Sequence, residues 1–463
     1  MRRVLVLFAV FAVVAAGCGS DRGEDASGGA DDPAPSGTAA PGDTGGDETF
    51  GTLPSPCGEG EAGAVPTGGE EGDTQGITED SIAVGTISDP GFSGAPGLNQ
   101  EIFDAGEAFV AWCNDQGGIN GRELDLTLYD AAITEYQPQV TAACGQEFAI
   151  VGDGAVQDNF WATIGAPCGL VDIPGFAVTP EKAGTAGPGV TAETRVVQPV
   201  PNPWDRYPTG AIQILDEMHP GAIDHVGVLF GDLATTAIQK DRMLEAIEGE
   251  GGTVVYEAAT NILGEANWAP FAAEIADAGV EWLVVIGAGE STGLLQQALL
   301  EIDYEPEVTL LETNFYDPVY LDAAGPAGDG TYIRMVFTPF EEAADNPATA
   351  RYLELVEAID GKVALLGAQS MSAWLLFATA AKECDDAGDL SRSCILDTAG
   401  AVEEWDGGGL HAAGDPSTNT PSPCVMLVQI QDGEFVRATP DEGFDCDDDA
   451  IATLEGDYAT STD

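Results

Sequence analysis

The sequence predicts an α/β protein made of two doubly wound parallel-sheet lobes that are joined by a hinge. Short buried-strand patterns alternate with helical patterns in two successive runs, one before and one after a proline-rich stretch at 199–208. Strands that alternate with helices form parallel sheets with crossover helices. About 385 residues follow residue 76, and 44% of the whole chain is hydrophobic. This length exceeds what one core usually holds and suits two lobes.

The first run begins with a strand and ends with a strand. Strands are predicted at 82–87, 124–129, 149–151 and 175–178, and helices at 102–112, 140–148 and 160–171. The first helix is predicted to end at Gln116-Gly117-Gly118, because glycine disfavours helix continuation. We expect the strand order 2-1-3-4, which puts the first helix on one face of the sheet and the other two helices on the opposite face.

The second run repeats this alternation after the hinge. Helices are predicted at 209–218, 236–248, 268–278 and 294–302, and strands at 226–230, 253–256 and 282–286. In such sheets a ligand binds beyond the carboxyl ends of the strands. With two lobes, this rule places the ligand in the cleft between them.

The N-terminus carries an export signal. Arg2 and Arg3 precede an apolar stretch at 4–16, and Ala15-Ala16-Gly17-Cys18 resembles a bacterial lipobox. The stretch is shorter than the ~20 residues of a membrane-spanning helix. We expect residues 1–17 to be a signal peptide and Cys18 to carry lipid that anchors the protein on the outer face of the cell membrane. An ordinary secretory signal is the alternative.

Two segments outside the lobes are strongly acidic. Residues 18–76 are rich in Gly, Pro and acidic residues and are predicted to form a disordered tether, and 447–463 are predicted to be an acidic tail. The formal net charge is −64. Only 13 of the 79 acidic residues lie in the tether, so the folded part is itself strongly acidic. Such a surface excludes nucleic acid as a partner.

The nine cysteines point to a disulfide framework. Removing Cys18 leaves eight, and none of these lies in a CxxC pair. The three histidines are far apart in sequence, so no zinc site or other metal site is expected. Cys384 with Cys394 and Cys424 with Cys446 are close in sequence. The strand order brings Cys144 to Cys168 on one face and leaves Cys113, on the other face, for Cys57.

Three short motifs suggest other functions. Gly289-Glu290-Ser291-Thr292-Gly293 fits the nucleophile elbow of a serine hydrolase, with His411 downstream, but no HGGG-type oxyanion segment follows an early strand. The glycines at 287, 289 and 293 hint at a dinucleotide loop with the wrong spacing. The acidic run at 445–449 lacks the glycine and glutamate of an EF-hand. We therefore expect a protein that is not an enzyme and has no cofactor.

The sequence resembles the leucine/isoleucine/valine-binding family, the type 1 periplasmic solute-binding proteins of ABC transporters. The resemblance lies in 82–86, 109–122, 174–180 and 267–280, with the turn Gly117-Gly118-Ile119-Asn120-Gly121-Arg122 as its most specific part. It implies a monomer that binds a small solute and delivers it to an ABC permease. It also implies three crossings between lobes, with a first lobe at 77–199 and 340–400 and a second lobe at 200–339 and 401–446. A ligand-sensing receptor of the same fold is the alternative function.

Candidate ligand-binding residues follow the predicted strand ends in both lobes. They are Asp89, Pro90, Phe92, Asp153, Gly154, Thr179, Pro180, Asp232, Thr235, Gly289, Glu290, Asn314, Phe315, Tyr316 and Asp317. The family members that bind amino acids carry hydroxyl residues after the third strand, whereas this chain has Gly152-Asp153-Gly154-Ala155. Because the candidates include five carboxylates and no basic side chain, we expect a positively charged or polyhydroxylated solute, such as an amino acid, amide or related compound.

Overall fold

The computed structural model describes residues 49–67 and 72–458, all within one compact unit that spans Gly46–Asp463. The predicted signal peptide, Cys18 and the tether before residue 49 lie outside the described residues. In the part that is described, no helix combines the length and apolar character needed to cross a bilayer. The lipid anchor therefore stays a prediction.

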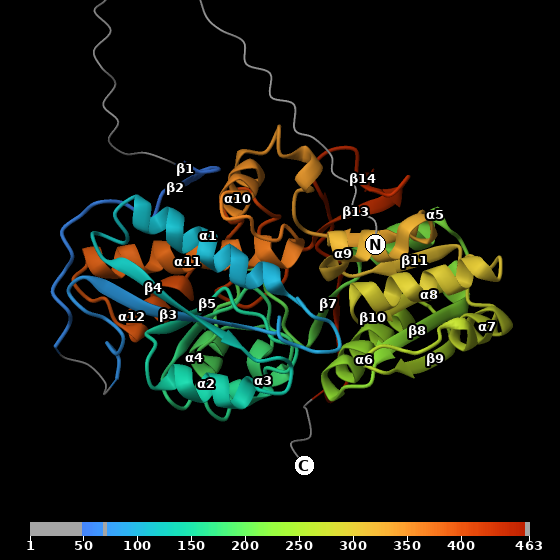
Figure 1. Ribbon diagram of the computed structural model, residues 1–463, viewed down its shortest axis with the longest axis horizontal. Coiled ribbons are helices and arrows are strands. Elements are labelled where there is room, and N and C mark those ends of the chain that lie inside the picture. Colours follow the sequence, from blue (N-terminus) through green and yellow to red (C-terminus); the bar gives the residue numbers. More distant parts are fainter. Residues whose placement is uncertain (1–48, 68–71, 459–463) are drawn as a thin grey trace, which may run out of the picture. The chain divides into compact units, whose positions relative to one another are not determined.

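The first lobe is built on a parallel sheet with the order β4-β3-β5-β6, which confirms the predicted 2-1-3-4 order, although the fourth strand lies at 171–173 and not at 175–178. Its strands are β3 (Ser81–Ser88), β4 (Glu123–Asp130), β5 (Ala149–Val151) and β6 (Val171–Ile173). Helices α1 (Gln100–Asp115) and α11 (Leu365–Asp386) lie over one face, and α2 (Tyr136–Cys144) lies over the other (Figure 1). Alternation along β3 explains both cores, because Val84 packs with α1 and α11 while Ile87 packs with Val140 of α2.

Two predictions for this lobe are wrong. Residues 160–171, predicted as a helix, form a 3-10 helix at Asn159–Trp161, a series of turns and the start of β6. The strand predicted at 175–178 is a loop that leads to α3 (Pro180–Ala183). The backbone N–H groups of Val178 and Thr179 donate to the buried Asp158 carboxylate, at 2.8 and 2.9 Å, and not to a neighbouring strand. Apolar runs this short show no period that separates strand from loop.

The second lobe is built on a mixed sheet with the order β14-β13-β12-β11-β10-β8-β9. The strands are β8 (Val226–Gly231), β9 (Val254–Thr260), β10 (Trp282–Ile286), β11 (Val308–Leu311), β12 (Tyr332–Met335), β13 (Cys424–Gln431) and β14 (Glu434–Thr439). Strands β8 to β12 are parallel, and β13 and β14 form an antiparallel hairpin at the edge. The predicted alternation of strands and helices is confirmed here.

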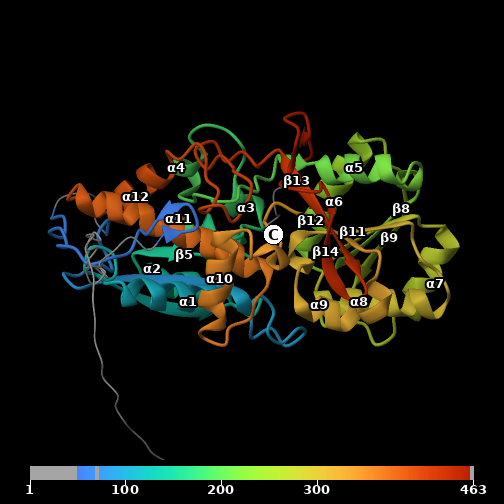
Figure 2. The same ribbon diagram turned by 90° about the horizontal axis from the view of Figure 1, so that it is seen from above.

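Helices cover both faces of the second sheet. They are α5 (Gly210–Met218), α6 (Ala234–Gly249), α7 (Ala269–Ala278), α8 (Gly289–Glu301) and α9 (Pro318–Ala324). Figure 2 shows α5 and α6 on one face and α7, α8 and α9 on the other. Short helical turns occupy Val190–Thr194 (α4), Ala222–His225, Thr313–Phe315, Gly325–Gly328 and Phe340–Glu342.

The chain returns to the first lobe after β12. Helices α10 (Pro347–Glu357), α11 and α12 (Arg392–Ala399) pack against α1 and β6 before β13 joins the second sheet. Arg122, at the end of the glycine-rich turn, is buried and donates to Asp385 of α11 at 2.5 Å. Gly118 has a φ of 72°, and a Cβ there would collide with the Arg122 carbonyl. This turn therefore needs glycine, and its arginine holds the returning helix.

Parts of both acidic segments are ordered and pack against the lobes. Residues 49–67 contain β1 (Thr49–Phe50) and β2 (Leu53–Pro54), and Phe50 is fully buried against the first lobe. The tail contributes β16 (Ile451–Thr453), which pairs with β7 (Arg206–Pro208), and Tyr458 is buried. The prediction of a disordered tether up to residue 76 is wrong for 49–67, and the prediction of a solvated tail from 447 is wrong for 450–458. A few buried apolar side chains, together with the Cys57–Cys113 disulfide in the first segment, hold these residues in place.

All four predicted disulfides are confirmed. They join Cys57 to Cys113, Cys144 to Cys168, Cys384 to Cys394, and Cys424 to Cys446, where β15 (Asp445–Cys446) pairs with β13. Cys168 lies in a turn and not on the predicted third helix, but the turn lies on the same side of the sheet as α2. In the described residues, no group of His, Cys, Asp and Glu is arranged to hold a metal ion.

Candidate functional site

A cavity of about 290 Å³ is lined by residues of both lobes. Loops after β3, β4 and β5 contribute Phe92, Ile133 and Val156 from the first lobe. Gly231 and Thr260 contribute from the carboxyl ends of β8 and β9 in the second lobe. The cavity therefore lies where the strand-end rule places a ligand of a doubly wound protein.

Most of the lining is apolar. The apolar side chains come from both lobes and from the segments between them: Phe92, Ala95, Leu98, Ile133, Val156, Phe176, Val178, Val200, Leu229, Leu233, Met243, Ile262, Trp268, Val285, Ile286, Leu295, Phe315, Val336 and Leu366. A wall of this kind gains free energy by removing apolar ligand surface from water, at about 25 cal/mol per Å².

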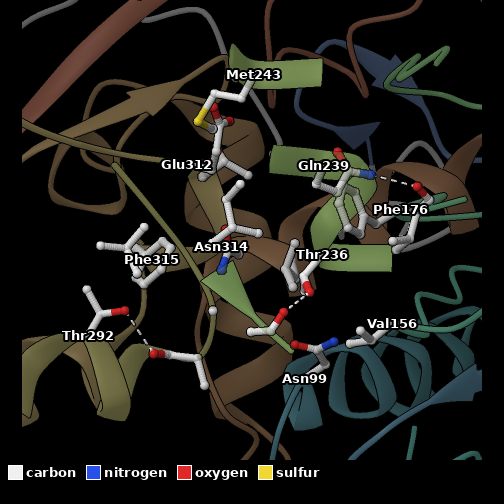
Figure 3. A pocket seen from close by; sticks show the side chains of 18 of the residues that line it. Asn99, Val156, Phe176, Thr236, Gln239, Met243, Thr292, Glu312, Asn314 and Phe315 are labelled. Carbon is white, nitrogen blue, oxygen red and sulfur yellow. Dashed lines mark hydrogen bonds between the residues drawn. The ribbon is translucent and has the colours of Figure 1, made fainter. Parts of the chain in front are cut away.

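One end of the cavity carries an ion pair. In Figure 3, Glu312 and Met243 lie at the top of the view, and Asn99 and Val156 lie at the bottom right. The Arg334 guanidinium of β12 donates two hydrogen bonds to Glu312 Oε2, at 2.7 and 2.9 Å. The Tyr207 hydroxyl donates to Glu312 Oε1 at 2.7 Å. Burial alone would raise the pKa of Glu312, but Arg334 and Tyr207 lower it, so the carboxylate stays ionised.

A second arginine, Arg242 of α6, lies at this end and is only 2% exposed. Its guanidinium donates to the carbonyls of Trp204, Pro203 and Arg206 and to Gln239 Oε1. No carboxylate among the described residues forms an ion pair with it. Burial lowers the pKa of Arg242 from its usual value, but an arginine keeps its proton at any physiological pH.

Several polar side-chain atoms of the lining have no protein partner. Within the described residues, Trp268 Nε1 and Gln369 Oε1 are buried without a hydrogen bond. The side chains of Asn99, Ser291 and Asn314 likewise make no hydrogen bond to the described chain, whereas Thr292 donates to the Ala288 carbonyl at 3.1 Å (Figure 3). Asn99, Ser291 and Asn314 are only half-buried. Buried polar atoms without a partner cost free energy, so Trp268 Nε1 and Gln369 Oε1 are the atoms best suited to a bound molecule.

Few of the predicted ligand-binding residues line the cavity. Phe92, Asn314 and Phe315 do. Asp89 is fully buried and accepts hydrogen bonds from the backbone N–H groups of Ile133 and Val156, and burial raises its pKa to about 6. Asp153 is also fully buried and forms an ion pair with Lys182 at 2.6 Å. These two carboxylates fold inward and hold loops, so they are not available to a ligand in the cavity.

The remaining candidates have other places in the structure. Asp317 caps α9 and pairs with Lys362 at 2.7 Å, and the buried Tyr316 hydroxyl contacts Glu341. Asp232 and Glu290 are exposed side chains that do not line the cavity. Six further candidates do not line the cavity either and lie in neighbouring turns and helix starts: Pro90, Gly154, Thr179, Pro180, Thr235 and Gly289. A strand-end position gives the neighbourhood of a residue but not the direction of its side chain.

The charged residues of the cavity are not among the residues predicted from the sequence. Arg242 lies in the middle of α6 and Arg334 lies within β12, so neither follows a strand end. Tyr207 lies in the proline-rich hinge, and Glu312 follows β11 directly. One signal was present for Arg334: the chain has only 15 Lys and Arg residues against 79 acids, so an arginine within the apolar strand Tyr332–Met335 is unusual.

The structure does not assemble the serine hydrolase site. Ser291 lies in the first turn of α8 and lines the cavity, but His411 Nε2 contacts Ser372 at 2.8 Å and its Nδ1 contacts the Ala412 carbonyl at 2.9 Å. Trp405 Nε1 donates to the same Ser372 hydroxyl at 2.9 Å. Both nitrogens of His411 are occupied in a buried network, so His411 is not a base for Ser291.

Two α/β lobes with a ligand-sized cavity beyond their strand ends define the class of two-lobed solute-binding proteins. The family model described as "Periplasmic binding protein" matches residues 81–434, which is most of the chain. The chain belongs to this family, and the resemblance inferred from the sequence is confirmed. No curated protein matches the sequence.

Solved structures share this fold at low sequence identity. A fatty acid ABC transporter substrate-binding protein from Thermomonospora curvata is 17% identical with a TM-score of 0.67, over 81% of this chain and 95% of that one. A leucine-binding protein from Thermotoga maritima is 16% identical with a TM-score of 0.63, over 77% and 98%. A solute-binding protein from R. palustris in complex with 4-hydroxybenzoate is 15% identical with a TM-score of 0.60, over 78% and 96%.

Proposed function

We propose that this chain is the extracytoplasmic receptor of an ABC importer, anchored through lipid at Cys18, and that it encloses a small, largely apolar solute between its lobes. Family membership supports the role of solute receptor. The apolar wall of the cavity is the observation that carries the choice of solute. Function then needs no chemistry, only a difference in solute affinity between open and closed states.

We propose an apolar solute in place of the positively charged or polyhydroxylated solute expected from the sequence. That expectation depended on Asp89, Asp153, Asp232, Glu290 and Asp317, and none of them lines the cavity. Solved relatives are described as binding a fatty acid, leucine or 4-hydroxybenzoate, so the fold accommodates apolar bodies.

Contacts between the lobes surround the cavity. Gln239 of α6 donates to the Val178 carbonyl of the first lobe at 2.7 Å. Gly94, in the loop after β3, lies so close to the second lobe that a Cβ there would come within 2.8 Å of the Ile262 carbonyl. These contacts must separate for a solute to enter, so we take the arrangement to be the closed one. Closure over an apolar molecule would exchange its hydration for contact with both walls.

The proposal is tested by identifying what the full chain carries. Small molecules would be released by denaturation from gently purified protein and identified by untargeted mass spectrometry. Ala288 lines the cavity, so Ala288→Trp should fill part of it and exclude the solute, whereas Ala273→Trp on the exposed face of α7 serves as the matched control. We expect one largely apolar compound from the wild type and the control and none from Ala288→Trp. A sugar or a highly polar compound, or equal recovery from Ala288→Trp, would contradict the proposal.

A further inference from the structure

We infer that the solute is an amphipathic anion, with an apolar body and one carboxylate-type group that binds at the Arg242–Arg334 end of the cavity. This inference rests on the proposed function and names the class of solute. The first observation is the charge of the lining. It contains two arginines and one carboxylate, Glu312, which gives 2 − 1 = +1 in a chain whose formal net charge is −64.

The second observation is the number of N–H groups that these arginines leave over. A guanidinium has five N–H groups. Arg242 uses four of them, toward three carbonyls and Gln239, and Arg334 uses two of them toward Glu312. One N–H of Arg242 and three of Arg334 thus have no partner in the described chain. An arginine held against backbone carbonyls is fixed in direction but keeps its full charge.

The third observation is that Glu312 does not serve a cationic ligand. Each of its oxygens already accepts a hydrogen bond, one from the Tyr207 hydroxyl and the other from Arg334. Its charge therefore balances one arginine and leaves Arg242 uncompensated by any ion pair. The nearby acids Glu312 and Asp205 attract Arg242 but form no ion pair with it. A buried cation that is hydrogen-bonded to neutral acceptors keeps its charge, and a ligand anion supplies both a direct ion pair and acceptors for the remaining N–H groups.

The rest of the cavity limits where such an anion can lie. Beyond these four residues the lining has no ionisable side chain, and its walls are formed by rings and branched apolar groups, among them Phe92, Trp268 and Phe315. Along these walls Trp268 Nε1, a donor, and Gln369 Oε1, an acceptor, are both buried without a protein partner, so they offer a ligand one bond of each kind and no charge. The ligand must then hold its charge at one end and present hydrocarbon or ring surface elsewhere. Both a fatty acid and an aromatic acid have this chemistry.

Matched probes separate charge from apolar surface. The affinities of the full chain for octanoate, octanol and octylamine, and for benzoate and benzyl alcohol, would be measured by isothermal titration calorimetry after removal of any carried molecule. We expect each carboxylate to bind at least about tenfold more tightly than its alcohol, and the amine to bind most weakly. A stronger response to octanoate than to benzoate, or the reverse, distinguishes the chain-like from the aromatic source.

Two substitutions with opposite expected results keep misfolding from explaining the outcome. Arg242→Gln should abolish the preference for octanoate over octanol. Glu312→Gln keeps the size of the side chain but removes its charge, so it should tighten octanoate binding roughly tenfold and leave octanol binding unchanged. Arg437→Gln, which breaks the ion pair with Glu342 outside the cavity, is the control and should change neither affinity.

The outcomes separate the two proposals. If octanol binds as tightly as octanoate, or if Glu312→Gln weakens octanoate binding, the anion inference is wrong and the apolar cavity stands. If none of the five probes binds, the cavity does not take amphipathic molecules, and the proposed apolar solute is wrong as well.

Discussion

Lys182 is expected to be among the side chains whose loss most destabilises the first lobe. Its ammonium group lies 2.6 Å from Asp153 and 2.7 Å from Asp172, and all three side chains are fully buried. It also lies 5.5 Å from the ring centre of Trp161. Burial alone would lower the pKa of Lys182, but the two carboxylates raise it, so the cation is retained. Burial and the neighbouring Asp153 raise the pKa of Asp172.

Lys182→Met leaves two buried acids facing each other without a cation. Removing one partner of a buried ion pair costs about 3–5 kcal/mol. The roughly 400 described residues imply an unfolding entropy near 0.8 kcal/mol per degree, at about 2.1 cal/mol per degree for each residue. The expected decrease in Tm is therefore about 4–6 °C. Because the two acids repel each other less when protonated, the deficit should shrink as the pH is lowered from 7.5 to 5.

Thermal unfolding of the full chain, followed by calorimetry, measures this decrease. Lys240→Met is the matched control, because Lys240 pairs with Asp241 and Glu257, which are 55% and 44% exposed. Pairs of this kind contribute about 0.2–1 kcal/mol, so Tm should fall by about 1 °C or less. A decrease for Lys182→Met no larger than that of the control, or a deficit that grows on acidification, would refute the reasoning.

Three further predictions concern other parts of the chain. Burial lowers the pKa of His411 to about 4. Its contribution to stability is therefore complete above the unfolded pKa near 6.5, and roughly 3 kcal/mol of it is lost as the pH falls through 4. Denaturant titrations should show that the free energy of unfolding of His411→Gln depends less on pH over this range. Replacing Cys57 and Cys113 together by Ala opens a loop of 56 residues and should cost about 4 kcal/mol in the free energy of unfolding, and an unchanged urea midpoint would count against the ordered 49–67 segment. Cys18→Ala should release the protein into the medium or leave the precursor unprocessed, and cell fractionation that finds it processed and still membrane-bound would disprove the anchor.

Sequence periodicity predicted the fold well because parallel α/β sheets carry a strong signal. Strands such as 226–230 and 282–286 are buried on both faces and read as continuous apolar runs, and helices between them show a separate period. The strand order and handed crossovers then placed the cysteines. The failure at 175–178 has a local cause. Asp158, a buried polar residue, takes the N–H groups of the next segment, and no periodic pattern reveals such a contact.

The cavity was harder to predict than the fold. The strand-end rule found Phe92, Asn314 and Phe315, because the loops that follow the carboxyl ends of parallel strands come together at the cavity. It failed for Asp89 and Asp153, since each finds buried partners within its own lobe, backbone N–H groups in one case and Lys182 in the other. It could not find Arg242, whose direction is set by carbonyls of the hinge segment about 40 residues earlier in the chain.

A crystal structure of the full chain with octanoate would show directly whether the cavity binds an amphipathic anion through its arginines. We expect one octanoate in the cavity between the lobes, with a carboxylate oxygen about 2.7–3.2 Å from a guanidinium nitrogen of Arg242 or Arg334. Its hydrocarbon chain should run toward the walls that contain Phe92, Trp268 and Phe315. Octanoate bound elsewhere on the protein, or bound in the cavity with its carboxylate at the opposite end, would show that the two arginines do not form the anion site.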